Sequence, residues 1–315
     1  TSLKDLQKLG VDAVSVAGGV GEISLNLGAG DFTWANGSVV NFEGDTDLRV
    51  TLNSTDVGQL DDITLAATGL HTAGIDAVNL DLSGQGSLDT LLGTGFLADE
   101  IAVFNTNLDA LDHTGIQAIV GISQDQAQEL TKDAATFTFN ADDTVVMHTD
   151  TAAQGTHLST SLKDLQKLGV DAVSVAAGVT GINVDLGEGF NFNPATGGIT
   201  LFGDTNGDGT ISVQEDAALH VTLHASHADL AHLSDMSADG SNFALAGVDE
   251  IFFDVSDEAG LTTLLADQPA LKALEGASLD VSVDFGGVHV GVDALHLDAQ
   301  GNITLDAEGA SQGTH

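Results

Sequence analysis

The residues whose spacing could bind a metal ion lie in the stretch DTNGDGTISVQE, residues 204–215. Acidic or amide side chains occupy its first, third and fifth positions, Gly its sixth and Glu its twelfth, as in the calcium loop of an EF-hand. About six or seven oxygen ligands suit Ca2+ better than Mg2+, which needs a smaller octahedral cage. We therefore predict a Ca2+ site here, the alternative being an acidic surface turn that binds nothing. The predicted ligands are Asp204, Asn206, Asp208, Thr210, Ser212 and Glu215.

The segments that flank this loop do not have the pattern of EF-hand helices. GGITLFG, residues 197–203, alternates in the manner of a strand, and DAALHVTLH, residues 216–224, leaves room for about one helical turn before a β-type run. A calcium sensor of this class opens a groove by moving two helices apart. We therefore expect a structural calcium site set in a β-rich segment.

The chain contains a tandem repeat. TSLKDLQKLGVDAVSVA, residues 1–17, recurs identically at 160–176, and QGTH closes both halves. We predict one copy at 1–157, a junction at 158–159 and a second copy at 160–315.

The calcium loop is an insertion in the second copy. LRVTL at 48–52 matches LHVTL at 219–223 only after the offset between the copies has grown from 159 to 171 residues. The similarity continues from GIDAVNLDLSGQGSLDTLL, residues 74–92, to GVDEIFFDVSDEAGLTTLL, residues 247–265. Copy one lacks the loop, so we expect the fold to form without the ion and the metal to add local order in copy two.

A smaller unit recurs inside each copy, in which a helix, a glycine and a strand follow one another. In SLKDLQKLGVDAVSV, Ser2 can cap a helix, and Gly10 can end it in the left-handed conformation. Leucines at helical spacing and valines typical of a strand lie on either side of this glycine: Leu3, Leu6, Leu9, Val11, Val14 and Val16. The glycine motif is found at Gly10, Gly74, Gly115, Gly169, Gly247 and Gly291.

These patterns predict a mixed α/β, β-rich fold of two tandem homologous domains. Each domain would be built from short helix-glycine-strand units and β-hairpins, and each is large enough to bury a core. The expected hairpins are ATFTFNADDTVVMHT at 135–149 and ALHLDAQGNITLDA at 294–307, with Asn, Asp and Gly in their turns.

Composition excludes several partners. The chain has 47 acidic and 7 basic residues and a formal charge of −40, yet 42% of its residues are hydrophobic, which is too many for a disordered tail. Such a charge repels nucleic acid and anionic lipid, and no apolar run reaches the roughly 18 residues of a membrane span. The expected partners are other copies of itself or neighbouring repeats of a longer chain, and a cell-surface or matrix polymer.

Asp outnumbers Glu by 37 to 10, which fits turns and oxygen ligands, and cysteine is absent. A secreted protein without disulfides relies on its core and on bound ions, although a cytoplasmic protein can also lack cysteine. The start within the repeat suggests a piece of a longer chain.

Long near-identical repeats, an acidic cysteine-free composition and an EF-hand-type loop together resemble the repeat region of large bacterial calcium-binding surface proteins. These are giant adhesins, biofilm matrix proteins and S-layer proteins, so the resemblance implies an extracellular, calcium-stabilised role in cell adhesion or assembly. Members secreted by the type I route often carry a glycine-rich nonapeptide. GGVGEISLN at 18–26 comes near to it but has Ile23 in place of the acid.

The sequence offers little support for an enzyme. It has no G-x-S-x-G elbow, no H-E-x-x-H, no phosphate-binding loop and no cysteine nucleophile. His220, His224, His227 and His232 could ligate zinc if their segment were helical, but LHVTLH alternates like a strand, so exposed histidines are the favoured interpretation. The paired acids at 61–62 and 142–143 are expected in turns.

Three functions fit this composition: a structural repeat module, a carbohydrate- or surface-binding module, and an acidic cytoplasmic protein of a salt-loving organism. Glycan-binding surfaces need exposed aromatic rings. The chain has one Trp, Trp34, and no Tyr, and Phe252 and Phe253 lie in an apolar run where a core role is expected. The structural class is therefore favoured.

Overall fold

The computed structural model describes residues 2–29, 33, 40–44, 48–84, 98–133, 137–139, 143–149, 154–175, 178–187, 200–201, 220–245, 247–285, 288–297 and 303–305. Contacts divide the chain into two compact units. Unit 1 consists of Thr1–His148 with Leu168–Val170, and unit 2 of Thr149–Lys167 with Asp171–His315. Three residues of the second sequence copy therefore belong to unit 1.

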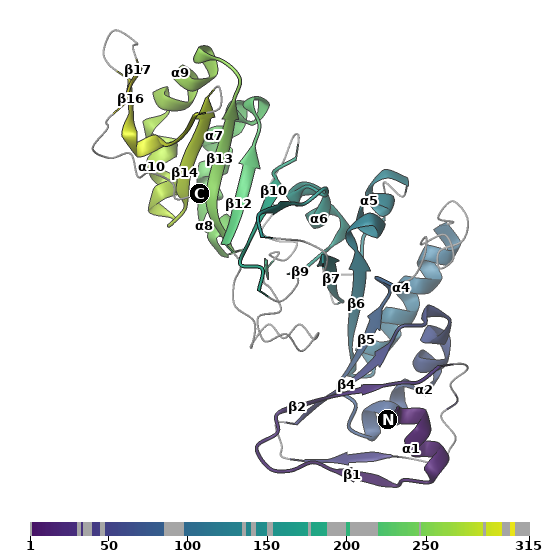
Figure 1. The fold of residues 1–315 in the computed structure, drawn as a ribbon. Coiled ribbons are helices and arrows are strands. Elements are labelled where there is room, and N and C mark those ends of the chain that lie inside the picture. Colours follow the sequence, from purple (N-terminus) through teal and green to yellow (C-terminus); the bar gives the residue numbers. More distant parts are fainter. Residues whose placement is uncertain are drawn as a thin grey trace. The chain divides into compact units, whose positions relative to one another are not determined.

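Unit 1 contains a parallel sheet with helices in its connections (Figure 1). Its strands lie in the order β2, β4, β5, β6, β7, and each neighbouring pair is parallel. The strands are β2 (Glu22–Asn26), β4 (Arg49–Ser54), β5 (Ala77–Asp81), β6 (Gln117–Ser123) and β7 (Thr144–Thr149, of which Thr149 belongs to unit 2). The helices are α1 (Leu3–Leu9), η1 (Val57–Gln59), α2 (Leu60–Thr72), α4 (Ala98–His113) and α5 (Gln124–Asp133). Two short strands, β1 (Ala13–Ser15) and β3 (Asn41–Glu43), form a separate parallel pair.

The core of unit 1 lies between its sheet and its helices. Ile63 and Leu70 lie about two turns apart on the same apolar stripe of α2, and both are fully buried. Helix α4 packs on both α2 and β6. Val78 in β5 and Val120 in β6 are buried as well. Because burying one such side chain stabilises a fold by about 2 kcal/mol, this layer holds the strands in place.

Unit 2 contains a second, mostly parallel sheet in the order β8, β10, β12, β13, β14, β15, of which only the β14–β15 pair is antiparallel. Its strands are β8 (Thr156–His157), β10 (Gly181–Asp185), β12 (His220–Ala225), β13 (Val248–Val255), β14 (Asp280–Phe285) and β15 (Val288–Gly291). Its helices are α6 (Leu162–Leu168, of which Leu168 belongs to unit 1), η3 (His227–His232), α7 (Leu233–Ala238), α8 (Gly240–Leu245), α9 (Glu258–Ala266), α10 (Gln268–Gly276) and η4 (Val292–Ala294). Strand β9 (Ala172–Val175) pairs in parallel with β11 (Thr200–Leu201), and β16 (Leu295–Leu297) pairs in antiparallel fashion with β17 (Ile303–Leu305).

The two faces of the sheet in unit 2 differ in polarity. Burial alternates along β12, where Val221 and Leu223 are buried while Thr222 and His224 are partly exposed. Helices α8, α9 and α10 pack on β13 and β14. A parallel sheet usually has apolar residues on both faces. Here one face is polar and is reached by solvent, which makes it a candidate binding surface.

The two sequence copies form the same backbone hydrogen bonds at equivalent positions. The N–H of Lys4 donates to the carbonyl of Leu27 at 3.2 Å, and the N–H of Lys163 donates to that of Leu186 at 3.1 Å. The carboxylates of Asp76 and Asp249 each accept a backbone N–H from the start of the neighbouring strand, at 2.8 and 2.9 Å. Equivalent residues therefore have equivalent structural roles in the two copies.

The predicted helix-glycine-strand unit is confirmed for α1. Helix α1 spans Leu3–Leu9, Ser2 caps it by accepting the N–H of Asp5, and Gly10 ends it with a φ of 70°. Five of the six motif glycines have a positive φ, namely Gly10, Gly74, Gly115, Gly169 and Gly247. The interpretation of Gly291 was wrong, because this residue belongs to β15 and has a φ of −62°. Ser278 takes the corresponding place before β14, with a φ of 69°.

The fold class is mixed α/β. One predicted hairpin, at 294–307, corresponds to the antiparallel pair β16–β17. The other, at 135–149, was wrong: β7 pairs in parallel with β6, and residues 137–139 are not in a strand. The apolar alternation in the second half of this segment correctly indicated a strand, β7, but β7 pairs with β6, which lies further away in sequence than the expected hairpin partner. Within the described part of the chain, no helix has the length and apolar character needed to cross a bilayer.

Candidate functional site

The predicted calcium ligands lie outside the described residues. Asp204, Asn206, Asp208, Thr210, Ser212 and Glu215 all fall between β11 and β12 in a segment that the structure does not describe. Among the residues that it does describe, it brings together no group of three or more His, Cys, Asp or Glu side chains able to hold a metal ion. The Ca2+ site therefore stays a prediction from the sequence.

The four histidines considered for zinc do not lie on one helical face. His220 and His224 belong to strand β12, while His227 and His232 begin and end the 3-10 helix η3. His220 lies 3.5 Å from a carboxylate oxygen of Asp249, and His232 lies at the same distance from one of Asp235. The alternation of LHVTLH indicated a strand correctly, and only His220 and His224 of these four residues lie in it.

A row of four rings crosses the polar face of the sheet in unit 2. His157 in β8 and His224 in β12 have ring centroids 4.7 Å apart, His224 and Phe252 in β13 are 4.8 Å apart, and Phe252 and His289 in β15 are also 4.8 Å apart. Phe252 is only partly buried and therefore does not have the core role expected of it. Phe253, on the opposite face, is fully buried as expected. The strand period of two residues separates these neighbours onto the two faces.

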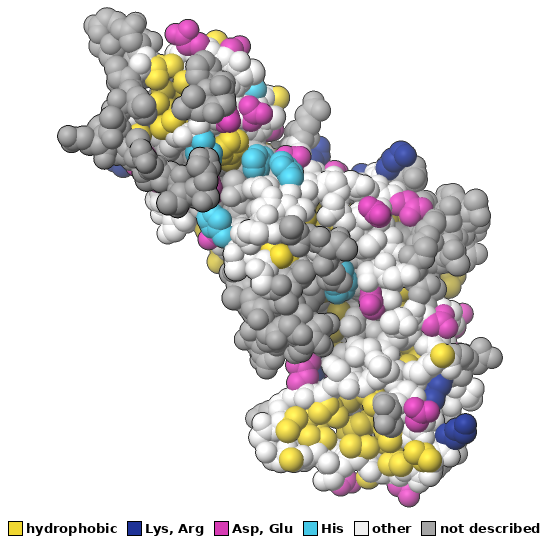
Figure 2. All heavy atoms as spheres, in the orientation of Figure 1, with side chains coloured by type: hydrophobic (Ala, Val, Ile, Leu, Met, Phe, Trp, Pro, Cys, Tyr) yellow, Lys and Arg dark blue, Asp and Glu magenta, His cyan; other side chains and the backbone are white. Residues whose placement is uncertain are grey.

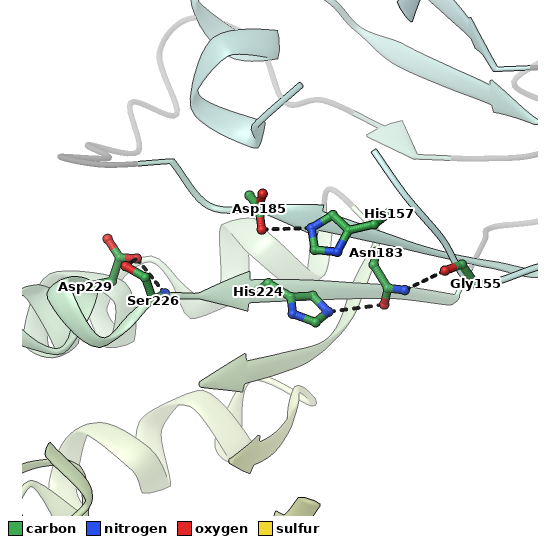
Figure 3. Close-up of polar contacts among 7 residues, drawn as sticks. All are labelled: Gly155, His157, Asn183, Asp185, His224, Ser226 and Asp229. Atoms are coloured by element: carbon green, nitrogen blue, oxygen red, sulfur yellow. Dashed lines mark hydrogen bonds and ion pairs between the residues drawn. The ribbon is translucent and has the colours of Figure 1, made fainter. Parts of the chain in front are cut away.

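Polar side chains of β10 hold the first two rings of this row (Figure 3). The imidazole of His157 lies 2.8 Å from a carboxylate oxygen of Asp185. The imidazole of His224 lies 3.3 Å from the side-chain oxygen of Asn183, whose amide donates to the carbonyl of Gly155 at 2.8 Å. These contacts fix the rings of His157 and His224 in one orientation.

The electrostatics of the ring row disfavour a charge on its second histidine. Partial burial lowers the pKa of His224, and the nearby His157 lowers it further, while the carboxylates of Asp185, Glu250 and Asp254 act in the opposite direction. Glu250 also lies 3.6 Å from His289 and accepts the hydroxyl of Ser282. The row is therefore a set of half-exposed rings edged by carboxylates, an arrangement suited to contact with a polar ligand.

Ser226 and Asp229, at the end of β12, form a helix cap (Figure 3). One carboxylate oxygen of Asp229 accepts both the backbone N–H and the hydroxyl of Ser226, each at 2.7 Å. The Asp229 side chain is buried, and it joins the end of the strand to the start of η3.

The first pair of acids has different surroundings from those expected. Asp61 and Asp62 lie in the first turn of α2 rather than in a turn, a place where the helix dipole favours negative charge. Asp143 is buried beside the start of β7, and Asp142 lies outside the described residues. The sequence did not single out His157, His289, Asp185 or Glu250 of the ring row. Their alternation with apolar residues was a signal for one face of a sheet, but not for which strands lie beside each other.

A second candidate site is the segment that is identical in the two copies, because its burial differs between them. Leu9 at the end of α1 is 75% exposed, whereas its counterpart Leu168 is 1% exposed. Leu6, Val11, Val14 and Val16 are partly exposed, while their counterparts Leu165, Val170, Val173 and Val175 are buried. The local sequence is the same, so the difference comes from what packs against each segment.

In unit 1 the end of α6 is covered by a segment from the last part of copy one. The backbone N–H of Phe139 donates to the carbonyl of Leu168 at 2.8 Å. A Cβ placed on Gly169 would lie 3.2 Å from the carbonyl oxygen of Phe139 and 3.6 Å from its Cβ. Phe139 is itself buried and packs edge to face against Phe137, with ring centroids 4.8 Å apart.

The same contact occurs at the end of α2. The N–H of Phe42 in β3 donates to the carbonyl of Ala73 at 3.0 Å, and the backbone of Phe42 lies 3.4 Å from the place of a Cβ on Gly74. At Gly10, in contrast, no atom of the described residues lies within 4 Å of the corresponding position. An extended segment thus covers the glycine that ends α2 and the one that ends α6, while the one that ends α1 is open.

No protein-family model, characterised protein or solved structure matches this chain.

Proposed function

We propose that this chain is a structural repeat module of a secreted, calcium-stabilised bacterial cell-surface or matrix protein, acting by assembly or adhesion rather than by catalysis. It would comprise two homologous, β-rich domains in tandem, with one Ca2+ bound by the inserted loop at 204–215. The observation that carries this proposal is the burial of Leu168 by copy one while its twin Leu9 stays open. A surface that one repeat covers in the next repeat is expected of a module made to be joined to others.

Two further observations support a structural role. Asp76 and Asp249, which repeat in the sequence, each bind a backbone N–H of a neighbouring strand. Their carboxylates therefore organise the fold instead of meeting at one centre. Lack of cysteine and excess of Asp over Glu fit an exported protein that uses bound ions in place of disulfides.

Light scattering of the full chain tests the proposal. It is measured in Ca2+, in Mg2+ at equal ionic strength and in chelator. We expect concentration-dependent assembly in Ca2+ and less assembly in chelator, because relief of charge repulsion and the bound ion both favour compact repeats. Attachment of labelled protein to bacterial cells and matrix, measured in the same buffers, completes the test. A chain that stays monomeric and unattached in Ca2+ at every concentration would overturn the proposal.

The ring row favours a second candidate function, a carbohydrate- or surface-binding module. Aromatic rings offer an apolar surface, and carboxylates accept hydrogen bonds from hydroxyl groups, so this open sheet face offers both kinds of contact to a sugar. Affinity electrophoresis of the full chain through gels containing bacterial polysaccharides would detect binding. Phe252→Ser should abolish the retardation and Leu245→Ser, at an exposed helix end, should not. Equal retardation of the two variants, with unchanged circular dichroism, would rule out the ring row as a sugar site.

A further inference from the structure

The polar face of the sheet in unit 2 combines rings with carboxylates. Along β13, Glu250, Phe252 and Asp254 alternate with Ile251 and Phe253, which are fully buried on the other face. The six strands of this sheet contain no Lys or Arg. Figure 2 shows histidine and acidic side chains close to one another on the surface of unit 2. This face therefore has a negative charge and many groups that accept hydrogen bonds.

Three neighbouring side chains hold Glu250 in place at the centre of this face. One of its carboxylate oxygens accepts the hydroxyl of Ser282, and the other accepts that of Thr222 at 3.3 Å. The imidazole of His289 lies 3.6 Å from the carboxylate, and only 18% of the Glu250 side chain is exposed. Salt screens a partly buried charge less than an exposed one. Glu250 thus provides a fixed negative charge two residues from Phe252.

Copy one has other side chains at the equivalent positions of its own sheet. Alignment of residues 74–83 with residues 247–256 places Ala77 opposite Glu250 and Asn79 opposite Phe252. The buried positions between them are apolar in both copies. The core therefore does not require the acid and the ring of copy two, and their presence points to a ligand that contacts the outer face.

The chemistry of this face matches a ligand that carries protonated amines. Each such amine has three N–H donors, and a hydrogen bond to a carboxylate is about twice as strong as one between neutral groups. The face of an aromatic ring also attracts a cation. Burial lowers the pKa of His224, which keeps this ring uncharged where a charged one would repel the amine. Acidic sugars, in contrast, are repelled by the carboxylates.

The acids are spread over a length of the face greater than one sugar unit. The Cα atoms of Glu250 and Asp254 are about 13 Å apart, because a strand rises about 3.3 Å per residue. Asp284 in β14 is the register partner of Asp254. A ligand that meets acids at both places therefore has amines on more than one of its units.

We propose that the ring row and the acids beside it bind a polysaccharide whose sugar units carry free amino groups. This inference rests on the second candidate function, a carbohydrate-binding module, and names the class of sugar. Phe252 provides an apolar contact for a sugar ring, and Glu250 accepts hydrogen bonds from an amino group.

A matched pair of ligands tests the preference for amines. Short oligomers of glucosamine and their N-acetylated counterparts have the same sugar backbone and differ in charge. Isothermal titration of the full chain uses a mildly acidic buffer, in which the amines are protonated. We expect the amino form to bind about tenfold more tightly or better, since only this form makes charge-assisted hydrogen bonds. Equal or tighter binding of the acetylated form would overturn the inference.

Matched variants separate the ring row from the general attraction between a chain of net charge −40 and any cation. Glu250→Gln keeps the shape of the side chain and removes its charge, and Phe252→Asn introduces the residue of copy one. Each should weaken binding of the amino form about tenfold. Glu275→Gln on α10 removes an exposed acid from the helical layer and should leave the affinity unchanged. Circular dichroism checks that all three variants fold.

The outcomes separate this inference from the functions proposed above. If Glu250→Gln, Phe252→Asn and Glu275→Gln bind the amino form equally well, net charge alone attracts it and the inference is wrong. If both forms bind equally but Phe252→Asn binds neither, the ring row is a sugar site without a preference for amines. If the parent chain binds neither form and no bacterial polysaccharide, the second candidate function fails as well. The structural role is tested separately by assembly in Ca2+.

Discussion

The backbone N–H of Phe139 donates to the carbonyl of Leu168, so the last part of the first sequence copy covers the end of a helix in the second. The identical helix at the start of the chain ends at Leu9, which is exposed. Two leucines with the same neighbours in sequence thus differ in what surrounds them. Each leucine of this pair is therefore a control for the other.

Leu168→Ala should lower the free energy of unfolding by about 2–5 kcal/mol, because it leaves a cavity in a packed site. Leu9→Ala should change it by no more than about 0.5 kcal/mol, as is usual for an exposed position. Urea unfolding followed by circular dichroism measures both at a protein concentration where the chain is monomeric. Equal losses in the two variants would show that the two helices are equally covered.

Ser278→Gly should raise stability by up to about 1 kcal/mol. Ser278 holds a φ of 69° at the end of α10, a conformation that costs a non-glycine residue about 1 kcal/mol. The matched control is Ser234→Gly in the first turn of α7, which should lower stability by several tenths of a kcal/mol because glycine is a poorer helix former than serine. Thermal melts of the two variants should shift in opposite directions, and a shift in the same direction would contradict the role of Ser278.

Lowering the pH should destabilise unit 2 through His224, whose pKa burial lowers from the ordinary value of 6.5. The unfolded chain then binds more protons than the folded one between pH 6.5 and the lowered pKa. The contribution of His224 to stability is therefore complete above pH 6.5 and falls as the pH decreases through that window.

His224→Asn, which introduces the residue found at the equivalent Asn53 of copy one, should reduce the difference in melting temperature between neutral and mildly acidic buffer. His113→Asn, at the exposed end of α4, serves as the control and should keep the full difference. A difference unchanged by His224→Asn would show that other groups cause the pH dependence.

Calcium titration of the full chain should detect a strong site that Asp208→Ala abolishes. Asp12→Ala, an exposed acid of copy one, should leave the site intact. At a Ca2+ concentration about 100 times the dissociation constant, the site adds roughly 2.7 kcal/mol to stability. Mg2+ at equal ionic strength should supply only the screening part, so a Mg2+ melting temperature as high as that in Ca2+ would contradict a specific loop site.

Local patterns predicted the small elements of this fold correctly. Helix α1 was predicted with its cap and its end from Ser2, the leucine spacing and Gly10. This was possible because helix capping and the left-handed glycine depend on residues within one or two turns. The identical segment also predicted that copy two would repeat this helix, as α6 does. The motif failed at Gly291, which does not have a positive φ. The positive φ before β14 belongs to Ser278, and a serine does not predict that conformation.

Strand pairing could not be predicted in the same way. β7 was expected in a hairpin with its near neighbour in sequence, yet it pairs with β6 in parallel. The ring row could be predicted only from the strand order β8, β10, β12, β13, β14, β15. This order brings the ring centroids of His157 and His224 to 4.7 Å, although the two residues are 67 positions apart in sequence. Alternation tells which side chains share a face, but pairing depends on the burial that each arrangement of strands allows.

The sequence by itself determined that a helix, a glycine and a strand occur twice with identical residues, and that a calcium-type loop interrupts the second copy. Only the tertiary structure decided that one of the two identical segments is covered and the other open. The physical reason is that helix formation is set by neighbours a few residues away. Burial of Leu168, by contrast, depends on Phe139, which reaches it from the end of the preceding copy.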